Sequence, residues 1–556
     1  MKHIYKLIAG VLFLSLGITQ VTGQDIMDVP AVDDQGDPAL VNTIYGDTTE
    51  TGERANLNRI YRLERDGIYV LSAKIRVSYP LRLIAAEGSG RPPMIVRGQE
   101  ADGTNHNNMM GFMSNSTEHS FIDIIFQGVN LDRQHSGEDW FSGMVVIGDT
   151  VSVKFTRCIF NGFTANAFST YGDETSAYFR DCVFRNFLSN KHPYEGQQVL
   201  MGKEKLDTLI VTNCTSFNNN SYWLTHSNVA DFVVIEHNTI YASLVRALGM
   251  PYLVNGNIRS NLFYATSVYG HDTVSTISIQ EVPPDDLSET GLTEADRIVN
   301  VTHNAFFWPQ KSKDYWTDYA DDVVEPVWMR AETQAIFEDN DTWPYIHESN
   351  NLEMDPLFSD NAMDTWVIDE LSNWCRESRD TDTDTIGWGV YTGDRNYDVH
   401  MNANDDPAFT LVWPLPENME YTDATLLTAG HDGLPVGNLN WDQALRAQYT
   451  EPLQIDPTTV GIREAVAQPD NQLSHIYPNP FHSKITIYLS LPAPGITTLK
   501  VYNIEGQEVA TLVNHQLLNA GSHNFDLDAD QLASGIYFYQ LKWNQRTDIK
   551  KMVLMK

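Results

Sequence analysis

Long apolar segments are scarce in this sequence. The longest, residues 7–18, follows Lys2 and Lys6 and leads into Val21 and Gly23. A basic start, about a dozen apolar residues and small residues after them are typical of a secretory signal peptide, which predicts removal of residues 1–23. No later segment approaches the roughly 20 apolar residues that a membrane-spanning helix needs. The sequence therefore predicts an exported protein without a transmembrane helix.

Cysteine is also scarce, with four in 556 residues. A chain of this length does not depend on so few cysteines for a disulfide framework. Cys158, Cys182 and Cys214 instead fall within a repeated pattern, described below, and Cys375 lies outside it. No Cys-x-x-Cys or histidine spacing accompanies them, so the sequence predicts no cysteine metal site and no metal ligands elsewhere.

Positive charge is the third deficit, because 37 Lys and Arg face 73 Asp and Glu. From residue 473 to the end the net charge is +1, so the remainder carries −37 of the total −36. So acidic a surface repels phosphate backbones, which makes nucleic acid an unsuitable partner. It favours solubility outside the cell, and bound calcium could still present positive charge to an anionic polysaccharide.

Residues from about 60 to 310 repeat loosely as a short apolar strand, a polar pivot and a second short apolar strand. The pivots are Gly128, Cys158, Cys182, Cys214, Asn238, Asn261 and Asn304, which lie 30, 24, 32, 24, 23 and 43 residues apart. A period near 23 or 24 with insertions indicates a solenoid whose coils vary in one loop. A leucine-rich repeat has a similar period, but the copies lack its leucine spacing and no helix separates their strands.

This pattern predicts an all-β body over residues 24–309, a right-handed parallel β-helix with an N-terminal cap. It resembles the fold of pectate lyases, alginate lyases and chondroitinase B. Equivalent residues of successive coils then stack about 4.8 Å apart, so the three cysteines form a ladder that the asparagines continue. Stacked neighbours hold their Cβ atoms parallel, which strains a disulfide, so buried free thiols are expected.

Residues 310–449 are rich in Trp, Asp and Pro, and they include one expected helix over 365–376. We interpret them as irregular packing on the side and end of the β-helix, because a solenoid needs its last coil covered. Residues 355–358 and 429–441 resemble closing segments of exported bacterial β-helix proteins. The acidic run 380–384 lacks the glycine and final glutamate of a calcium loop and is read as a solvated turn. Residues 450–472 are expected to be a linker.

The last part of the chain alternates short strands with turn residues, which predicts a small Ig-like antiparallel sandwich. It contains YPNPF at 477–481, VYNIEGQEV at 501–509, LNAGSH at 518–523, SGIYFY at 534–539 and KKMVLMK at 550–556. In this order and at the chain end, these blocks resemble the type A C-terminal sorting domain of type IX secretion, over residues 473–556. The resemblance implies recognition by the outer-membrane translocon, then cleavage, with the product secreted or attached to surface lipopolysaccharide.

Known catalytic signatures of β-helix enzymes are absent. Asp285 and Asp286 lie in a loop without the other polygalacturonase motifs, and Arg91 and Arg97 miss the pectate lyase spacing by one residue. The calcium ligands of alginate and chondroitin lyases cannot be placed either. The sequence thus predicts no required cofactor, although calcium stays possible, and it leaves enzymatic activity undecided.

The spacing of the pivots nevertheless suggests a site. If the pivots are in register, the residues eight and nine positions after them share one side of the helix. That column contains Asn166, Ala167, Asn190, Lys191, Tyr222, Trp223, Arg246, Ala247, Tyr269 and Gly270, with His192 and His226 beside it. Aromatic faces stack on sugars, and Lys or Arg neutralises uronate carboxylates.

Two functions follow from this column, and a chance collection of polar side chains is the simpler alternative. A secreted or cell-surface protein would bind an extracellular polysaccharide through Asn190, His192, Tyr222, Trp223, His226 and Tyr269. An enzyme, either a polysaccharide lyase acting by β-elimination on a uronate-containing glycan or a related glycan-degrading enzyme, would in addition use Lys191 and Arg246 as catalytic residues. A lyase must neutralise the carboxylate and supply a base.

Overall fold

A computed structural model of the chain divides into two compact units, residues 1–460 and 461–556. The structure describes residues 25–129, 142–187, 196–278, 294, 297–380, 410–452 and 474–554. Short gaps within these ranges fall at 34, 100–102, 104–105, 203, 251, 271–274, 360, 478–483, 492–494, 504–507, 519–520, 530–531, 534 and 544–545. The expected signal peptide and nearly all of the 380–384 run lie outside the described residues.

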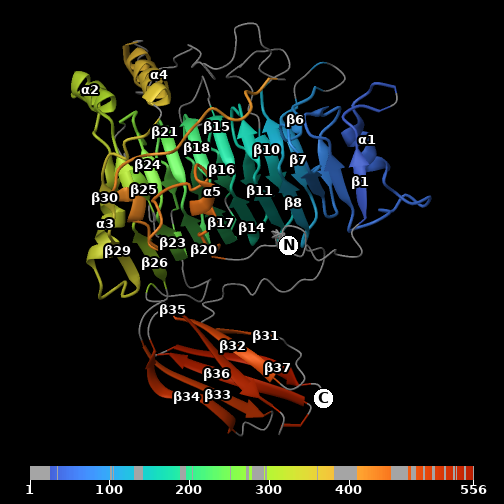
Figure 1. Cartoon of the computed structure of the whole chain (residues 1–556), viewed down its shortest axis with the longest axis vertical. Coiled ribbons are helices and arrows are strands. Elements are labelled where there is room, and N and C mark those ends of the chain that lie inside the picture. The colour runs from blue at the N-terminus through green and yellow to red at the C-terminus, as the bar shows by residue number, and fades with distance from the viewer. Residues whose placement is uncertain are drawn as a thin grey trace, which may run out of the picture. The chain divides into compact units, whose positions relative to one another are not determined.

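The first unit is a right-handed parallel β-helix with three long sheets, as predicted (Figure 1). Each complete coil passes from the 9-stranded to the 11-stranded and then to the 10-stranded sheet. The 11-stranded sheet consists of β1 (Ile26–Val29), β2 (Ile60–Leu63), β5 (Arg82–Ala85), β8 (Glu118–Ile122), β11 (Ser152–Thr156), β14 (Thr175–Arg180), β17 (Leu206–Thr212), β20 (Val229–Glu236), β23 (Tyr252–Arg259), β26 (Ile298–Thr302) and β29 (Ile346–Ser349).

The other two sheets follow the same coil order. The 10-stranded sheet consists of β3 (Ile68–Val70), β6 (Met94–Val96), β9 (Ile125–Gln127), β12 (Ile159–Asn161), β15 (Val183–Phe187), β18 (Thr215–Asn219), β21 (Thr239–Ser243), β24 (Leu262–Tyr264), β27 (Ala305–Phe307) and β30 (Leu352–Glu353). The 9-stranded sheet consists of β4 (Ile75–Val77), β7 (Asn108–Phe112), β10 (Ser142–Val146), β13 (Phe168–Thr170), β16 (Val199–Met201), β19 (Leu224–His226), β22 (Leu248–Gly249), β25 (Ser275–Ser278) and β28 (Val327–Met329).

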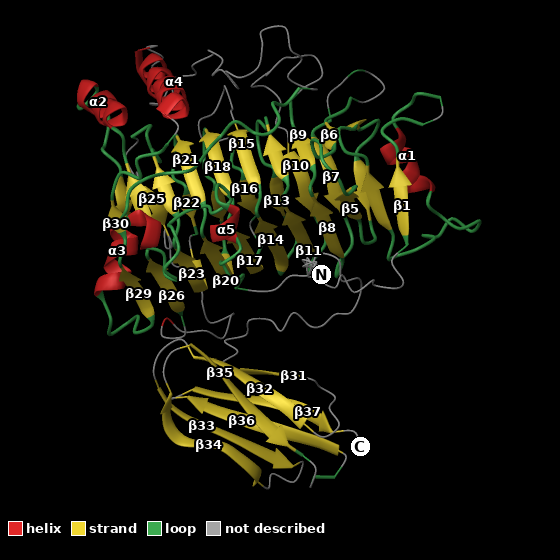
Figure 2. Cartoon of the chain, viewed as in Figure 1, coloured by secondary structure: helices red, strands yellow, loops and turns green. Residues whose placement is uncertain are grey.

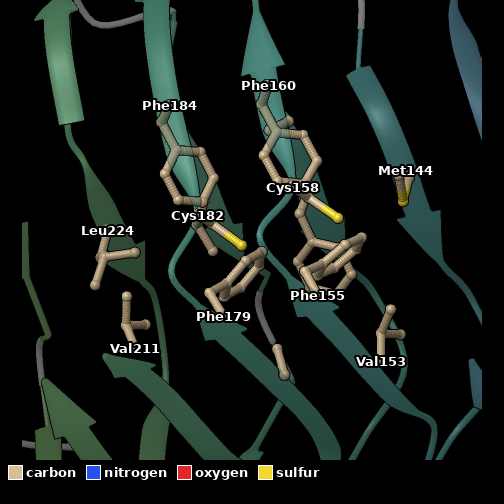
Figure 3. Close-up of a cluster of buried hydrophobic side chains, with 14 of the residues drawn as sticks. Met144, Val153, Phe155, Cys158, Phe160, Phe179, Cys182, Phe184, Val211 and Leu224 are labelled. Atoms are coloured by element: carbon tan, nitrogen blue, oxygen red, sulfur yellow. The ribbon is translucent and has the colours of Figure 1, made fainter. Parts of the chain in front are cut away.

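Alternation along the strands builds the interior of the coil. In β11, Val153 and Phe155 are buried in the core while Lys154, between them, is only partly buried. Phe155 stacks on Phe179 of the next coil with ring centroids 4.9 Å apart, and Phe160 stacks on Phe184 at 5.0 Å (Figure 3). Because like residues repeat at one register position, each aromatic ring packs on its copy in the next coil.

The cysteine ladder is confirmed, and all four cysteines are buried free thiols. Cys182 N–H lies 3.3 Å from Cys214 Sγ, and Cys214 N–H donates to Asn238 Oδ1 at 2.8 Å. The asparagine ladder that follows runs one coil further than predicted, to Asn351. The assignment of Gly128 as the first pivot was wrong. Ile159 pairs with Ile125, so Ile124 is the residue that precedes Cys158 in the ladder.

The ladder lies at what we call the tight edge, the set of two-residue turns between the 11- and 10-stranded sheets. In each of eight coils, the first turn residue has a positive φ between 51° and 57°. These residues are Asp123, Arg157, Asp181, Asn213, His237, Ser260, His303 and Asn350. None of the eight residues is glycine, so each turn holds a side chain in the left-handed backbone conformation, which few residue types adopt readily.

The helices lie along and at the ends of the coils (Figure 2). They are α1 (Ala39–Gly46), α2 (Gln310–Asp318), α3 (Ala331–Glu338), α4 (Asn361–Asp380) and α5 (Gln443–Arg446), with a 3-10 turn at Leu426–Thr428. Ile44 of α1 and Ile336 of α3 belong to the coil core, while Leu371 of α4 packs in a second cluster with Tyr269. The parallel sheets continue through β28, β29 and β30, so the β-helix extends to Glu353 and not only to the predicted residue 309.

Residues 461–556 contain the predicted antiparallel sandwich. One sheet consists of β31 (Ser474–Tyr477), β32 (Lys484–Leu491) and β35 (Gly521–Asp528). The other consists of β33 (Gly495–Asn503), β34 (Glu508–Leu518), β36 (Gly535–Trp543) and β37 (Arg546–Leu554). Ile487 and Leu527 of the first sheet share a buried cluster with Val501, Leu541 and Met552 of the second, so the two sheets pack face to face.

Candidate functional site

The predicted column lies at the insertion edge, our name for the connections from the 10-stranded to the 9-stranded sheet. Val199 pairs with Leu224, and Leu224 pairs with Leu248. Two positions before these residues, Gln197, Tyr222 and Arg246 occupy one register position in three successive coils. Tyr222 and Arg246 are therefore neighbours, as predicted from the pivot spacing.

Tyr222 and Arg246 also contact one another. The Arg246 guanidinium carbon lies 5.9 Å from the centroid of the Tyr222 ring, a cation–π distance. The ring lies over Gly249, where an added Cβ would be only 3.2 Å from Tyr222 Cε1. Tyr222 is half-buried, and Arg246 is 5% exposed. A glycine under an aromatic ring leaves the ring close to the sheet, with a cation at its side.

Trp223 does not lie on the outer surface, which corrects the prediction. Its side chain is fully buried in the coil core, in the cluster that contains Leu224, Ala247 and Leu248. The indole turns inward because burial of so large an apolar side chain stabilises the fold by several kcal/mol. Trp223 is therefore part of the core and cannot stack on a glycan.

His226 and Tyr269 are likewise buried. His226 Nδ1 lies 2.6 Å from the Met201 carbonyl and Nε2 lies 3.1 Å from the Val229 carbonyl, and burial lowers its pKa. Tyr269 packs on Trp374 of α4, with ring centroids 6.0 Å apart. Both ring nitrogens of His226 thus face backbone carbonyls, and α4 covers Tyr269, so neither side chain is presented to a ligand.

The remaining predicted residues, Asn190, Lys191 and His192, lie outside the described residues. Their roles in binding or catalysis stay predictions. In the coil before Tyr222, the same register position is occupied by Gln197, because Val199 pairs with Leu224. In the coil after Arg246, it is occupied by Ser275, because Leu248 pairs with Ile277. The connections before β16 and β25 contain insertions of unequal length. A fixed count from the pivot therefore does not reach the same register position in those coils.

The outer face of the 9-stranded sheet beside Tyr222 carries mainly small side chains. Met144, Phe168, Leu224 and Leu248 point into the core, so the residues that alternate with them point outward. These outward residues are Gly111, Val145, Ser169, Leu200, Thr225 and Gly249.

Three large apolar residues follow consecutive strands of this sheet at one register position. They are Met113, Ile147 and Tyr171, which are 40%, 44% and 50% exposed. They lie outside the predicted column, which extends only forward from the pivots, although each directly follows a strand that alternates apolar and small residues.

One group of side chains in the described part of the chain could hold a metal ion. His237, His431 and Asp432 present donor atoms that all lie within 4.8 Å of one another. This group lies at the tight edge and not in the predicted column. No sequence spacing indicates it, because 194 residues separate the two histidines.

Residues 475–555 match the family model described as a secretion system C-terminal sorting domain. The prediction made for residues 473–556 is confirmed: the chain carries a type IX sorting domain, and it is exported to the cell surface or secreted. The secretion machinery is thereby implied as a partner. A search of curated proteins gives no match.

Among the described residues, no helix is long and apolar enough to cross a membrane.

Proposed function

We propose that this secreted or surface β-helix binds an extracellular polysaccharide along the outer face of the 9-stranded sheet. The observation that carries the proposal is the Tyr222–Arg246 pair beside outward residues that are mostly small. An aromatic ring offers a stacking surface for a sugar, and a guanidinium offers two donors to a carboxylate. Both groups come from adjacent coils, so they would contact neighbouring parts of one ligand.

An elongated ligand suits this face because the coils repeat about every 4.8 Å. The partly exposed side chains of Val145 and Thr225 are short enough for a chain to lie close to the sheet. The exposed side chains of Met113, Ile147 and Tyr171 provide an apolar border at the other end of the strands. Arg246 gives preference to an acidic polysaccharide, since it would supply the charge that the acidic protein otherwise lacks.

Binding is tested with the secreted chain on alginate, pectate, chondroitin and a neutral glucan, by calorimetry. We expect Tyr222→Ala and Arg246→Gln each to weaken binding of one acidic glycan about tenfold, which is about 1.4 kcal/mol. Arg62→Gln is the matched control, since Arg62 is a partly exposed arginine paired with Asp28 on the first coils. The proposal would be contradicted if the Arg62 and Arg246 substitutions weakened glycan binding equally. It would also be contradicted if the unaltered chain bound none of the glycans.

The same proteins and glycans, measured for release of unsaturated uronates, separate binding from β-elimination. A lyase would release unsaturated uronates, and Lys191→Ala or Arg246→Gln would abolish that release. A binding protein would show only the loss of affinity. Arg246 keeps the lyase open, because its guanidinium lies beside the half-buried Tyr222 ring and carries the positive charge that neutralises a uronate carboxylate.

A further inference from the structure

The segment 429–451, which we call the strap, crosses the tight edge of the β-helix. Gly437 N–H donates to the Ser260 carbonyl at 2.7 Å, and Asn438 N–H donates to Thr239 Oγ1 at 2.9 Å. Further along, Arg446 forms an ion pair with Asp181 at 2.7 Å. Contacts to consecutive coils thus hold the strap at a defined position across the turns.

His237, His431 and Asp432 meet under the start of the strap. His237 is the positive-φ residue of its turn, and its side chain is fully buried. Its Nε2 lies 3.0 Å from Asp432 Oδ2, and its ring centroid lies 5.6 Å from that of His431. Two imidazoles and a carboxylate from opposite sides of one interface therefore converge.

Ser260 orients the second imidazole. The Ser260 hydroxyl lies 2.7 Å from His431 Nδ1 and also accepts the backbone N–H of His431 at 2.9 Å. With Nδ1 directed to this hydroxyl, Nε2 of His431 is the nitrogen left for another partner. Such a second hydrogen bond commonly fixes the tautomer and ring orientation of a metal-bound histidine.

The surroundings of the cluster also suit a cation. Asp432 contributes a carboxylate, an anionic ligand that complements the two imidazoles. Glu236 pairs with Arg259 at 2.5 Å and so offsets the charge of that guanidinium.

We propose that His237, His431 and Asp432 form a binding site for one divalent transition metal ion, such as Zn²⁺, that joins the strap to the tight edge. Imidazole and carboxylate ligands suit Zn²⁺, and three protein ligands leave a fourth position for water. The ion would take the place of the direct contact between His237 Nε2 and Asp432 Oδ2. It would link segments 194 residues apart in sequence and so stabilise the folded chain.

The test uses the whole secreted chain, stripped with a chelator and titrated with Zn²⁺, Co²⁺ and Ca²⁺ by calorimetry. We expect one Zn²⁺ or Co²⁺ per chain, a higher melting temperature with Zn²⁺ that EDTA reverses, and no comparable effect of Ca²⁺. The absorption spectrum of bound Co²⁺ reports its nitrogen and oxygen ligands in the unaltered protein, so the result does not depend on a variant that fails to fold.

Substitutions then locate the ion. His431→Gln and Asp432→Asn should each weaken Zn²⁺ binding at least tenfold. His347→Gln should not, since His347 is exposed on β29, away from the cluster. Absence of stoichiometric Zn²⁺ or Co²⁺ binding by the unaltered chain would overturn the proposal. Equal affinity of the His431 and His347 variants would overturn it as well.

Discussion

The two edges of the 10-stranded sheet follow opposite rules. From β8 onward, all eight turns of the tight edge have two residues, from Asp123 to Asn351, whereas the first two connections between the same sheets, 64–67 and 86–93, have four and eight residues. At the insertion edge, the connections range from four residues between β18 and β19 to nineteen between β27 and β28. A turn of constant length keeps the coils in register, whereas variable connections add surface without disturbing it. Register is therefore fixed at one edge, and recognition can vary at the other.

An inserted residue tests the difference between the two edges most directly. One glycine inserted between Cys182 and Val183 should prevent folding of the β-helix, because a one-residue shift turns the alternating core side chains of β15 outward. The same insertion between Asp321 and Asp322, both exposed in the connection before β28, should cost under about 1 kcal/mol. Urea unfolding followed by circular dichroism measures both, and equal losses would show that the two edges do not differ.

Trp223→Ala tests whether the insertion edge contributes to the core as well as to the surface. Removing this fully buried indole should lower the free energy of unfolding by about 3–5 kcal/mol. Tyr222→Ala, one position earlier, should cost much less because that ring is only half-buried. The two variants are compared by urea unfolding; a larger loss for Tyr222 would refute the assignment of Trp223 to the core.

Asn261→Leu tests the hydrogen bonds of the tight edge. The Asn261 side chain donates to the Ile235 carbonyl at 2.8 Å and accepts from Asn238 N–H at 3.0 Å, so leucine would leave buried groups unpaired. We expect a loss of roughly 3 kcal/mol in unfolding free energy. The control Asn257→Leu lies on the outer face of β23, the strand before this turn, and should cost about 1 kcal/mol or less. Similar losses for both would mean that the ladder adds nothing specific.

Cys214→Asn should have the smallest effect, under about 1 kcal/mol. An asparagine there could accept from Cys182 N–H and donate to the Phe179 carbonyl, which Cys214 Sγ now approaches at 3.6 Å. Asn238 makes the equivalent contacts to Cys214 N–H and Val211 in the next coil. Thermal unfolding measures the difference. A loss near that of Asn261→Leu would show that the two halves of the ladder are not interchangeable.

The tight edge could be predicted from sequence because its residues repeat in kind and in spacing. Cys158, Cys182 and Cys214 mark one position, and Asn238, Asn261 and Asn304 continue it. Gly128 misled the first assignment because Ile124, the true member, is an ordinary apolar residue. The sorting domain was predictable for a different reason, since its sequence blocks occur in a fixed order.

The candidate site was only partly predictable. Counting from the pivots placed Tyr222 beside Arg246 correctly, because both of those coils have four-residue connections. It could not show that Trp223 points inward, since at the start of a short strand the spacing alone does not decide the direction. The His237–Asp432 contact joins residues 195 positions apart, a pairing that only the folded chain reveals.

The strap also affects the order in which the molecule can fold. Ladder contacts between coils span as few as 23 residues, so neighbouring coils can form one after another along the chain. The pair between Asp181 and Arg446 spans 265 residues. Contacts of such long range form late because they carry the largest loop-closure cost. The strap therefore docks only after the coils beneath it exist.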